Sequence, residues 1–131
     1  FAGIFIRKAI DGEPIHIFGD GTQSRDFNYI DDAVEAFLMA ADSPELHGGC
    51  FNLGADSHYT LLEFVNLLKK HCAFELALKP FPREHERIDI GDYYGNYDLF
   101  HSLTGWKPEI ELDEGIGRTI AYFTPRRALY W

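Results

Sequence analysis

The stretch PIHIFGDGTQSRDFNYIDDAVEAF, residues 14–37, joins a short apolar run to a polar turn and then to a helix-like segment. Apolar and other side chains alternate in IHIF (15–18), which predicts a short strand. GDG (19–21) is typical of a turn, because glycine adopts backbone angles that other residues resist. A strand, a turn and a helix in this order predict the α/β class, with Arg25 in the tight loop between strand and helix.

The helix predicted after this loop has one apolar face and an acidic start. Four apolar residues recur at the spacing of one helical stripe: Val34, Phe37, Leu38 and Ala41. Asp32 is followed three residues later by Glu35, which resembles a capping box with aspartate as the N-cap. Helix initiation is therefore a sufficient role for Asp32.

The rest of the chain alternates between helix and strand signals. Residues 1–10 predict a helix that Asp11-Gly12 ends, and TLLE (60–63) is a capping box that begins a second helix reaching about Cys72. The other predicted elements are a buried strand in CFNLG (50–54), a strand in FELALKPFP (74–82), a helix in LFHSLTGW (99–106) and a last helix from about Glu111. Segment 83–98 is charged and tyrosine-rich, which is typical of a functional loop.

Composition excludes several classes of function. The 131 residues are 46% hydrophobic, enough for one core, and the net charge of −9 argues against a nucleic-acid partner. Two cysteines form no disulfide framework, which favours a cytoplasmic protein. No apolar run approaches the roughly 20 residues of a membrane span. The chain begins at Phe1 as if inside an element, so we expect a piece of a larger protein.

The familiar catalytic and cofactor motifs are absent from the sequence. It contains no G-x-G-x-x-G, no G-x-x-x-x-G-K-[ST], no G-x-S-x-G and no H-E-x-x-H. The six histidines are scattered without metal-ligand spacing. We therefore expect neither a metal site nor a bound cofactor in this chain alone.

Four segments together resemble one family. Residues 14–37, FNLG (51–54), the TLLE helix and LTGWKPEIELDEGIGRTIAYF (103–123) are similar, in order, to the C-terminal part of extended short-chain dehydrogenases/reductases, which include NAD-dependent nucleotide-sugar epimerases and dehydratases. The resemblance implies that residues 1–131 are the substrate-binding region of a larger enzyme. It places the dinucleotide-binding Rossmann domain upstream of this chain, with NAD or NADP as the cofactor of the full-length enzyme.

The same resemblance implies roles for three residues near the opening stretch. The arginine of the family's G-x-x-x-R-D segment contacts the substrate diphosphate, and here that residue is Arg25. A guanidinium suits this role because it forms paired, charge-assisted hydrogen bonds to phosphate oxygens. The alternative is that Arg25 pairs with Asp26 or Asp31 and stabilises the turn. Ile17 and Phe18 would lie along the nucleotide base, although Phe18 could equally be a core residue.

The family's second phosphate-binding arginine lies in an R-P-G-D loop that this sequence lacks. REHERIDIGD offers Arg83 and Arg87 instead, and the distance to the G-W-x-P motif favours Arg87. The alternative for both is a solvated, charged loop. The family's catalytic tyrosine belongs to a Y-x-x-x-K motif, and none of the seven tyrosines here has a lysine four residues on. No catalytic residue is therefore assigned, and we expect the chain alone to be inactive.

Within the full-length enzyme, the resemblance implies hydride transfer from a sugar carbon to NAD⁺, with this region holding the nucleotide diphosphate. Two alternatives remain open: a reductase of the same superfamily that acts on a non-nucleotide carbonyl compound, and a non-catalytic binding module. The family also implies that the helix after residue 30 packs against the upstream domain, so this chain alone would expose apolar surface. A native homodimer is compatible with the sequence, which identifies neither the nucleotide, the sugar nor the preference between NAD and NADP.

Overall fold

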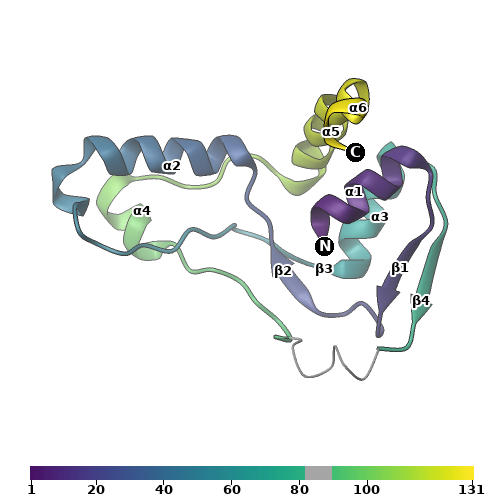
Figure 1. The fold of residues 1–131 in the computed structure, drawn as a ribbon. Helices are drawn as coiled ribbons and strands as arrows, with labels where there is room; N and C mark the ends of the chain where they lie inside the picture. The colour runs from purple at the N-terminus through teal and green to yellow at the C-terminus, as the bar shows by residue number, and fades with distance from the viewer. Residues whose placement is uncertain (82–89) are drawn as a thin grey trace.

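A computed structural model of the chain describes residues 1–81 and 90–131 (Figure 1). The helices of this part of the chain are α1 (Ala2–Asp11), α2 (Ile30–Asp42), α3 (Leu61–His71), α4 (Asp98–Thr104), α5 (Leu112–Phe123) and α6 (Arg127–Tyr130), with 3₁₀ turns η1 (Pro44–Leu46) and η2 (Thr124–Arg126). The strands are β1 (Ile15–Phe18), β2 (Ser24–Asp26), β3 (His58–Thr60) and β4 (Leu76–Lys79).

The described strands form two small sheets of opposite sense. Strand β1 pairs with β4 in parallel, with Ile15 opposite Leu76, and α3 lies in the connection between them. A parallel pair requires such a crossover, and a helix is its usual form. Strand β2 pairs with β3 antiparallel, with Arg25 opposite Tyr59. The mixture of short strands and helices confirms the predicted α/β class.

Local signals place several helix ends where the sequence predicts them. The Thr60 hydroxyl accepts the Glu63 backbone N–H, and the Glu63 carboxylate accepts that of Thr60, which completes the predicted capping box of α3. This hydrogen bonding from Thr60 lowers the pKa of Glu63. Gly12 and Gly105 end α1 and α4 with φ of 69° and 76°, a conformation that glycine adopts without a Cβ clash.

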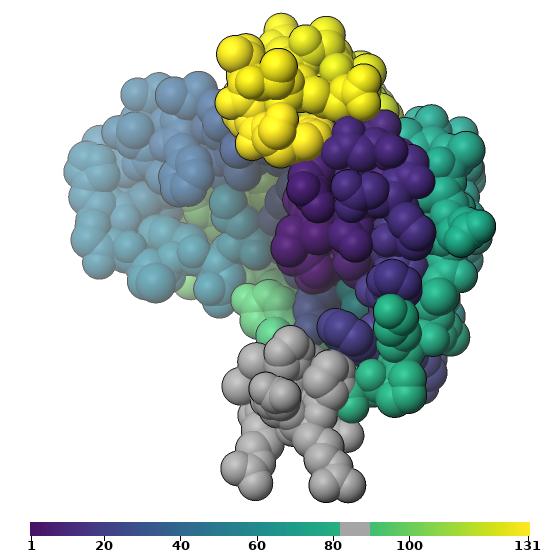
Figure 2. All heavy atoms as spheres, turned by 45° about the vertical axis from the view of Figure 1, so that its right-hand side comes forward, coloured from purple at the N-terminus to yellow at the C-terminus, as the bar shows by residue number. Residues whose placement is uncertain are grey.

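The main core lies between the β1–β4 sheet and helices α1, α3 and α5. Its buried members are Ala9, Ile15, Ile17, Leu61, Phe64, Val65, Leu68, Leu112 and Ile116. Figure 2 shows α1 (purple) against this part of the molecule, between the C-terminal helices (yellow) and the teal segments of α3 and β4. The apolar faces of α3 and α5 therefore build most of this core.

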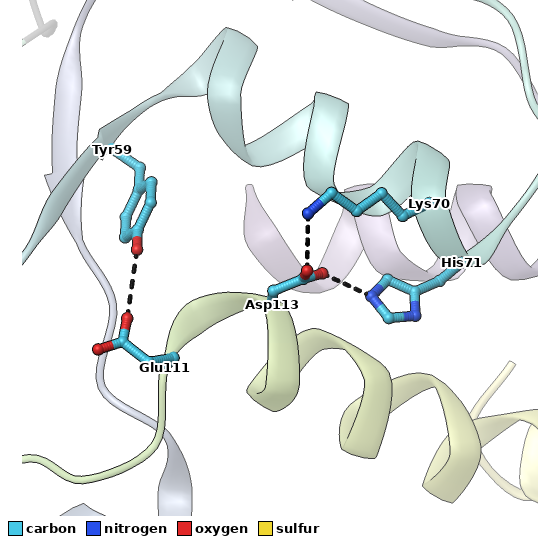
Figure 3. A network of polar contacts seen from close by, with 5 residues as sticks. All are labelled: Tyr59, Lys70, His71, Glu111 and Asp113. Carbon is cyan, nitrogen blue, oxygen red and sulfur yellow. Dashed lines mark hydrogen bonds and ion pairs between the residues drawn. The ribbon is translucent and has the colours of Figure 1, made fainter.

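A charged contact joins the C-terminal end of α3 to the first turn of α5 (Figure 3). Asp113 accepts hydrogen bonds from Lys70 Nζ at 2.7 Å and lies 2.8 Å from His71 Nε2. The Lys70 bond, followed by that of His71, lowers the pKa of Asp113. Each charge also lies at the helix end whose dipole favours it. The contact therefore fixes the relative position of two core helices.

A second, smaller core lies between α2 and α4, on the other side of the β2–β3 sheet in Figure 1. It consists of Ala36, Leu46, Phe100 and Trp106. Trp106 Nε1 donates to the backbone carbonyl of Asp32 at 3.0 Å, and the rings of Phe100 and Trp106 meet edge to face. Trp106 is therefore a buried packing anchor of this smaller core.

The start of α2 differs from the prediction. The N-cap position is Tyr29, without a side-chain cap, so Asp32 lies inside the helix. Asp32 is 4% exposed, and its carboxylate accepts the backbone N–H of Ile110 at 3.1 Å. The capping-box interpretation of Asp32 and Glu35 is therefore wrong, because a distant chain segment supplies the donor.

The apolar stripe of α2 is present, but it lies on the exposed face of the helix. Val34 is 45%, Phe37 70% and Leu38 63% exposed, while Ala36 faces the small core. This exposure is in line with the expectation of apolar surface on this helix.

The predicted strand in CFNLG is also wrong, because residues 50–54 form no strand and instead connect η1 to the region of β3. Within residues 1–81 and 90–131, no helix has the length and apolar character needed to cross a membrane.

Candidate functional site

An apolar hollow lies where β1 ends, between α1 and the turn after β1. Its volume is about 470 Å³. Aromatic and aliphatic side chains dominate the wall, and its lining comprises Phe1, Ile4, Phe5, Lys8, His16, Ile17, Phe18, Gln23, Leu61 and Phe81. Such a mixture, mostly apolar with a few polar groups, is typical of a site for a flat organic ligand.

The two predicted base-contacting residues both line this hollow. Phe18 is 37% exposed, and its ring centroid lies 6.1 Å from that of Phe81 at an interplanar angle of 48°. Ile17 is 1% exposed and belongs to the main core, so only a small part of its side chain reaches the hollow. Of the two, Phe18 offers the ring surface on which a base could stack.

A second, polar hollow of about 400 Å³ adjoins the first at Gln23 and Phe81. Its other lining residues are Gly19, Asp20, Thr22, Gly91 and Asp92. The carboxylate of Asp20 accepts hydrogen bonds from the hydroxyl and the backbone N–H of Thr22, and these bonds lower the pKa of Asp20. An ionised carboxylate accepts hydrogen bonds from hydroxyl groups, so this hollow suits a polyol.

Arg25 occupies a different setting from the predicted loop, because it is the central residue of strand β2. Its Nη1 donates to the carbonyl oxygen of Ser24 at 2.7 Å and to that of Gly91. A guanidinium has five N–H donors and can form several hydrogen bonds at once. The rigid strand holds the arginine more firmly than a loop would.

The carboxylates proposed as alternative partners of Arg25 have other contacts. Asp26 accepts the backbone N–H of Gly95 at 2.9 Å, and Asp31 lies 3.6 Å from Arg118. The two candidates for the second phosphate-binding arginine, Arg83 and Arg87, lie outside the described residues. Their roles stay predictions.

Sequence reasoning missed Phe81, which supplies the ring that faces Phe18. A signal was present: Phe18 ends one strand, and Phe81 follows the next strand of the same parallel pair. The carboxyl ends of parallel strands meet at one edge of a sheet, where α/β proteins place ligands. The backbone N–H of Gly19 donates to the carbonyl of Lys79 at 2.9 Å, which brings the two chain segments together.

Two further features of the described side chains bear on proton transfer and metal binding. Tyr97 donates a hydrogen bond to Asp56, which raises the pKa of Tyr97 to about 12, so its hydroxyl stays protonated at neutral pH. Residues 1–81 and 90–131 contain no cluster of three or more His, Cys, Asp or Glu side chains that could hold a metal ion.

Comparison with known proteins identifies the family that the first part of the chain matches. Residues 1–54, which contain α1, β1, β2 and Arg25, match the model of the NAD dependent epimerase/dehydratase family. The resemblance inferred from the four sequence segments is thereby confirmed.

Relatives within this family include epimerases and decarboxylases of UDP-sugars. The chain is 31% identical over 125 residues to UDP-glucuronic acid decarboxylase 1 of Danio rerio, covering 92% of this chain and 28% of the relative. The solved UDP-glucose 4-epimerase of Thermotoga maritima with UDP-glucose matches with a TM-score of 0.81 and 32% identity, over 98% of this chain and 40% of that one. UDP-glucuronic acid 4-epimerase of Bacillus cereus, in complex with UDP-glucuronic acid and NAD, matches with a TM-score of 0.75 and 25% identity, over 96% and 39%.

The chain thus spans well under half the length of these epimerase/dehydratase relatives. The similarity extends over nearly all of this chain, so it includes the residues that line the β1 hollow, the residues of strand β2, and Trp106.

Proposed function

We propose that this chain is the nucleotide-sugar-binding region of an NAD-dependent epimerase or decarboxylase that acts on a UDP-sugar. The names of its relatives support the reaction class, and the complex of the B. cereus epimerase supports NAD as the cofactor of the full-length enzyme. The cofactor loop and the tyrosine–lysine pair would belong to an upstream Rossmann domain. This chain alone would then bind substrate without turning it over.

The observation that carries the proposal is the order of surfaces along residues 18–25. An aromatic hollow at Phe18 is followed by a polar hollow at Asp20 and then by the guanidinium of Arg25. A nucleoside diphosphate has the same order of groups: a flat base, a ribose with hydroxyls, and a dianionic tail. Stacking, hydroxyl-to-carboxylate hydrogen bonds and guanidinium-to-phosphate contacts would then each act on one part of the ligand.

Thermal unfolding of the chain with UDP, GDP or dTDP tests the proposal. A ligand at one hundred times its dissociation constant stabilises the folded state by about 2.7 kcal/mol, which is several degrees for a domain of this size. We expect this shift with UDP and its loss in Arg25→Ala. Arg7→Ala is the matched control, because Arg7 lies on α1 outside the lining of both hollows and contacts Glu13 at 3.6 Å.

A shift that is equal in wild type and Arg25→Ala would contradict the phosphate role of Arg25. No shift with any nucleotide, at concentrations up to several millimolar, would contradict the proposed binding region and favour a non-nucleotide carbonyl substrate.

A further inference from the structure

Strand β2 has a second neighbour besides β3, which is the segment 91–95. The backbone N–H of Tyr93 donates to the carbonyl of Ser24 at 3.0 Å, and Arg25 forms an isolated parallel bridge with Tyr93. The segment lies more than sixty residues downstream of β2 in the sequence. The pairing of these two short stretches is therefore a tertiary contact, and few backbone bonds hold it.

Two carboxylates reinforce this pairing in reciprocal directions. Asp26, on β2, accepts the backbone N–H of Gly95 at 2.9 Å. Asp92, on the downstream segment, accepts the backbone N–H of Ser24 at 2.7 Å. Each segment thus supplies one carboxylate to a backbone donor of the other, and hydrogen bonds to charged groups are the stronger class.

Close backbone packing also constrains segment 91–95 on its other side, where it meets residues 53–54. A Cβ atom at Gly95 would overlap the carbonyl oxygen of Leu53, and one at Gly54 would overlap that of Gly95. Segment 91–95 is therefore held between β2 and residues 53–54, with little freedom to shift sideways.

The placement of segment 91–95 affects the side chain of Arg25, which contacts it. Its Nη1 donates to the carbonyl of Gly91, the residue directly before Asp92. The position of that carbonyl depends on the bonds that Asp92 and Asp26 make across the two segments. A long arginine side chain held in one orientation before binding loses less freedom when a ligand arrives.

We infer that Asp26 and Asp92 are positioning residues that hold the Arg25 guanidinium in place through segment 91–95. The inference rests on the proposed function only for the ligand that Arg25 contacts, which is the diphosphate. Asp26 lines neither hollow, whereas Asp92 also lines the polar hollow. Their role is to keep the Gly91 carbonyl beside the arginine.

The test compares Asp26→Ala and Asp92→Ala with the corresponding asparagine variants, because an amide oxygen still accepts the same backbone N–H. Asp42→Ala, which removes an exposed carboxylate at the end of α2, is the control for loss of one negative charge. The first readout is the ¹⁵N NMR signal of the Arg25 guanidinium in the chain without ligand. We expect restricted rotation in wild type, its loss in both alanine variants and its retention in both asparagine variants.

The second readout is affinity for UDP and for uridine. We expect both alanine variants to bind UDP about tenfold more weakly, equivalent to about 1.4 kcal/mol. Asp26→Ala, whose carboxylate lines neither hollow, should keep the wild-type affinity for uridine, which has no diphosphate. An unchanged Arg25 signal in both alanine variants would overturn the inference, whatever the chain binds. Absence of UDP binding in wild type would contradict the proposed function, while the guanidinium signal would still decide the positioning role.

Discussion

Replacing Asp32 by alanine tests the finding that this carboxylate joins two distant parts of the chain. The side chain is 4% exposed and accepts the Ile110 backbone N–H at 3.1 Å. Losing a hydrogen bond to a charged group costs about 1.5–3 kcal/mol, and because the Ile110 amide is only partly buried we expect about 2 kcal/mol. At about 4 °C per kcal/mol for a domain of this size, the thermal midpoint should fall by about 8 °C.

The matched variant is Asp32→Asn, whose amide oxygen still accepts the Ile110 N–H, and we expect it to lose less than about 1 kcal/mol. Urea unfolding followed by circular dichroism measures these differences. Glu35→Ala separates the two explanations, because a capping box would make this change costly, whereas the structure predicts an effect within about 0.5 kcal/mol. The reasoning would be refuted if Asp32→Ala unfolded like wild type, or if Glu35→Ala were as destabilising as Asp32→Ala.

Two further predictions concern the helix contact and the close backbone packing. The folded-state pKa of Asp113 is lowered from 3.8, so its contribution to stability is present above that pH and is lost as the pH falls through the lowered value. Urea unfolding between pH 7 and pH 2.5 should therefore show a smaller loss of stability in acid for Asp113→Asn than for wild type. An identical loss of stability in the two proteins would contradict this. Gly54→Ala should destabilise the chain by about 3 kcal/mol, since the new methyl would meet rigid backbone. Gly3→Ala, in open space on α1, should stabilise it by about 0.5–1 kcal/mol; equal midpoints for the two variants would contradict the packing argument.

Much of the fold could be predicted from the sequence, because much of it depends on neighbours in the chain. The Thr60–Glu63 capping box and the glycine caps at Gly12 and Gly105 use groups within one helical turn of each other. For the site, the sequence predicted that Phe18 ends a strand, and the structure places it there, at the wall of an apolar hollow. Its contact with a base stays a prediction.

Only the tertiary structure decided which face of an element is buried and which distant partner a residue contacts. The stripe of α2 reads as apolar in the sequence, but its exposure depends on what else packs against that helix, as the 70% exposed Phe37 shows. Strand β2 was missed because three residues carry too little periodicity, and its pairing with β3 and with segment 91–95 joins parts of the chain far apart in sequence.

The sequence by itself determined the helices, the turns and the aromatic and basic residues available for a ligand, since these follow from local chemistry. Tertiary structure decided that Arg25 lies on a strand, that Asp32 accepts the amide of Ile110, and that Phe81 faces Phe18. The physical reason is that the sequence specifies which hydrogen-bond acceptors and aromatic rings are present, whereas it does not specify where in space they lie. The partner of each group is set by which distant segment the packed core brings within reach.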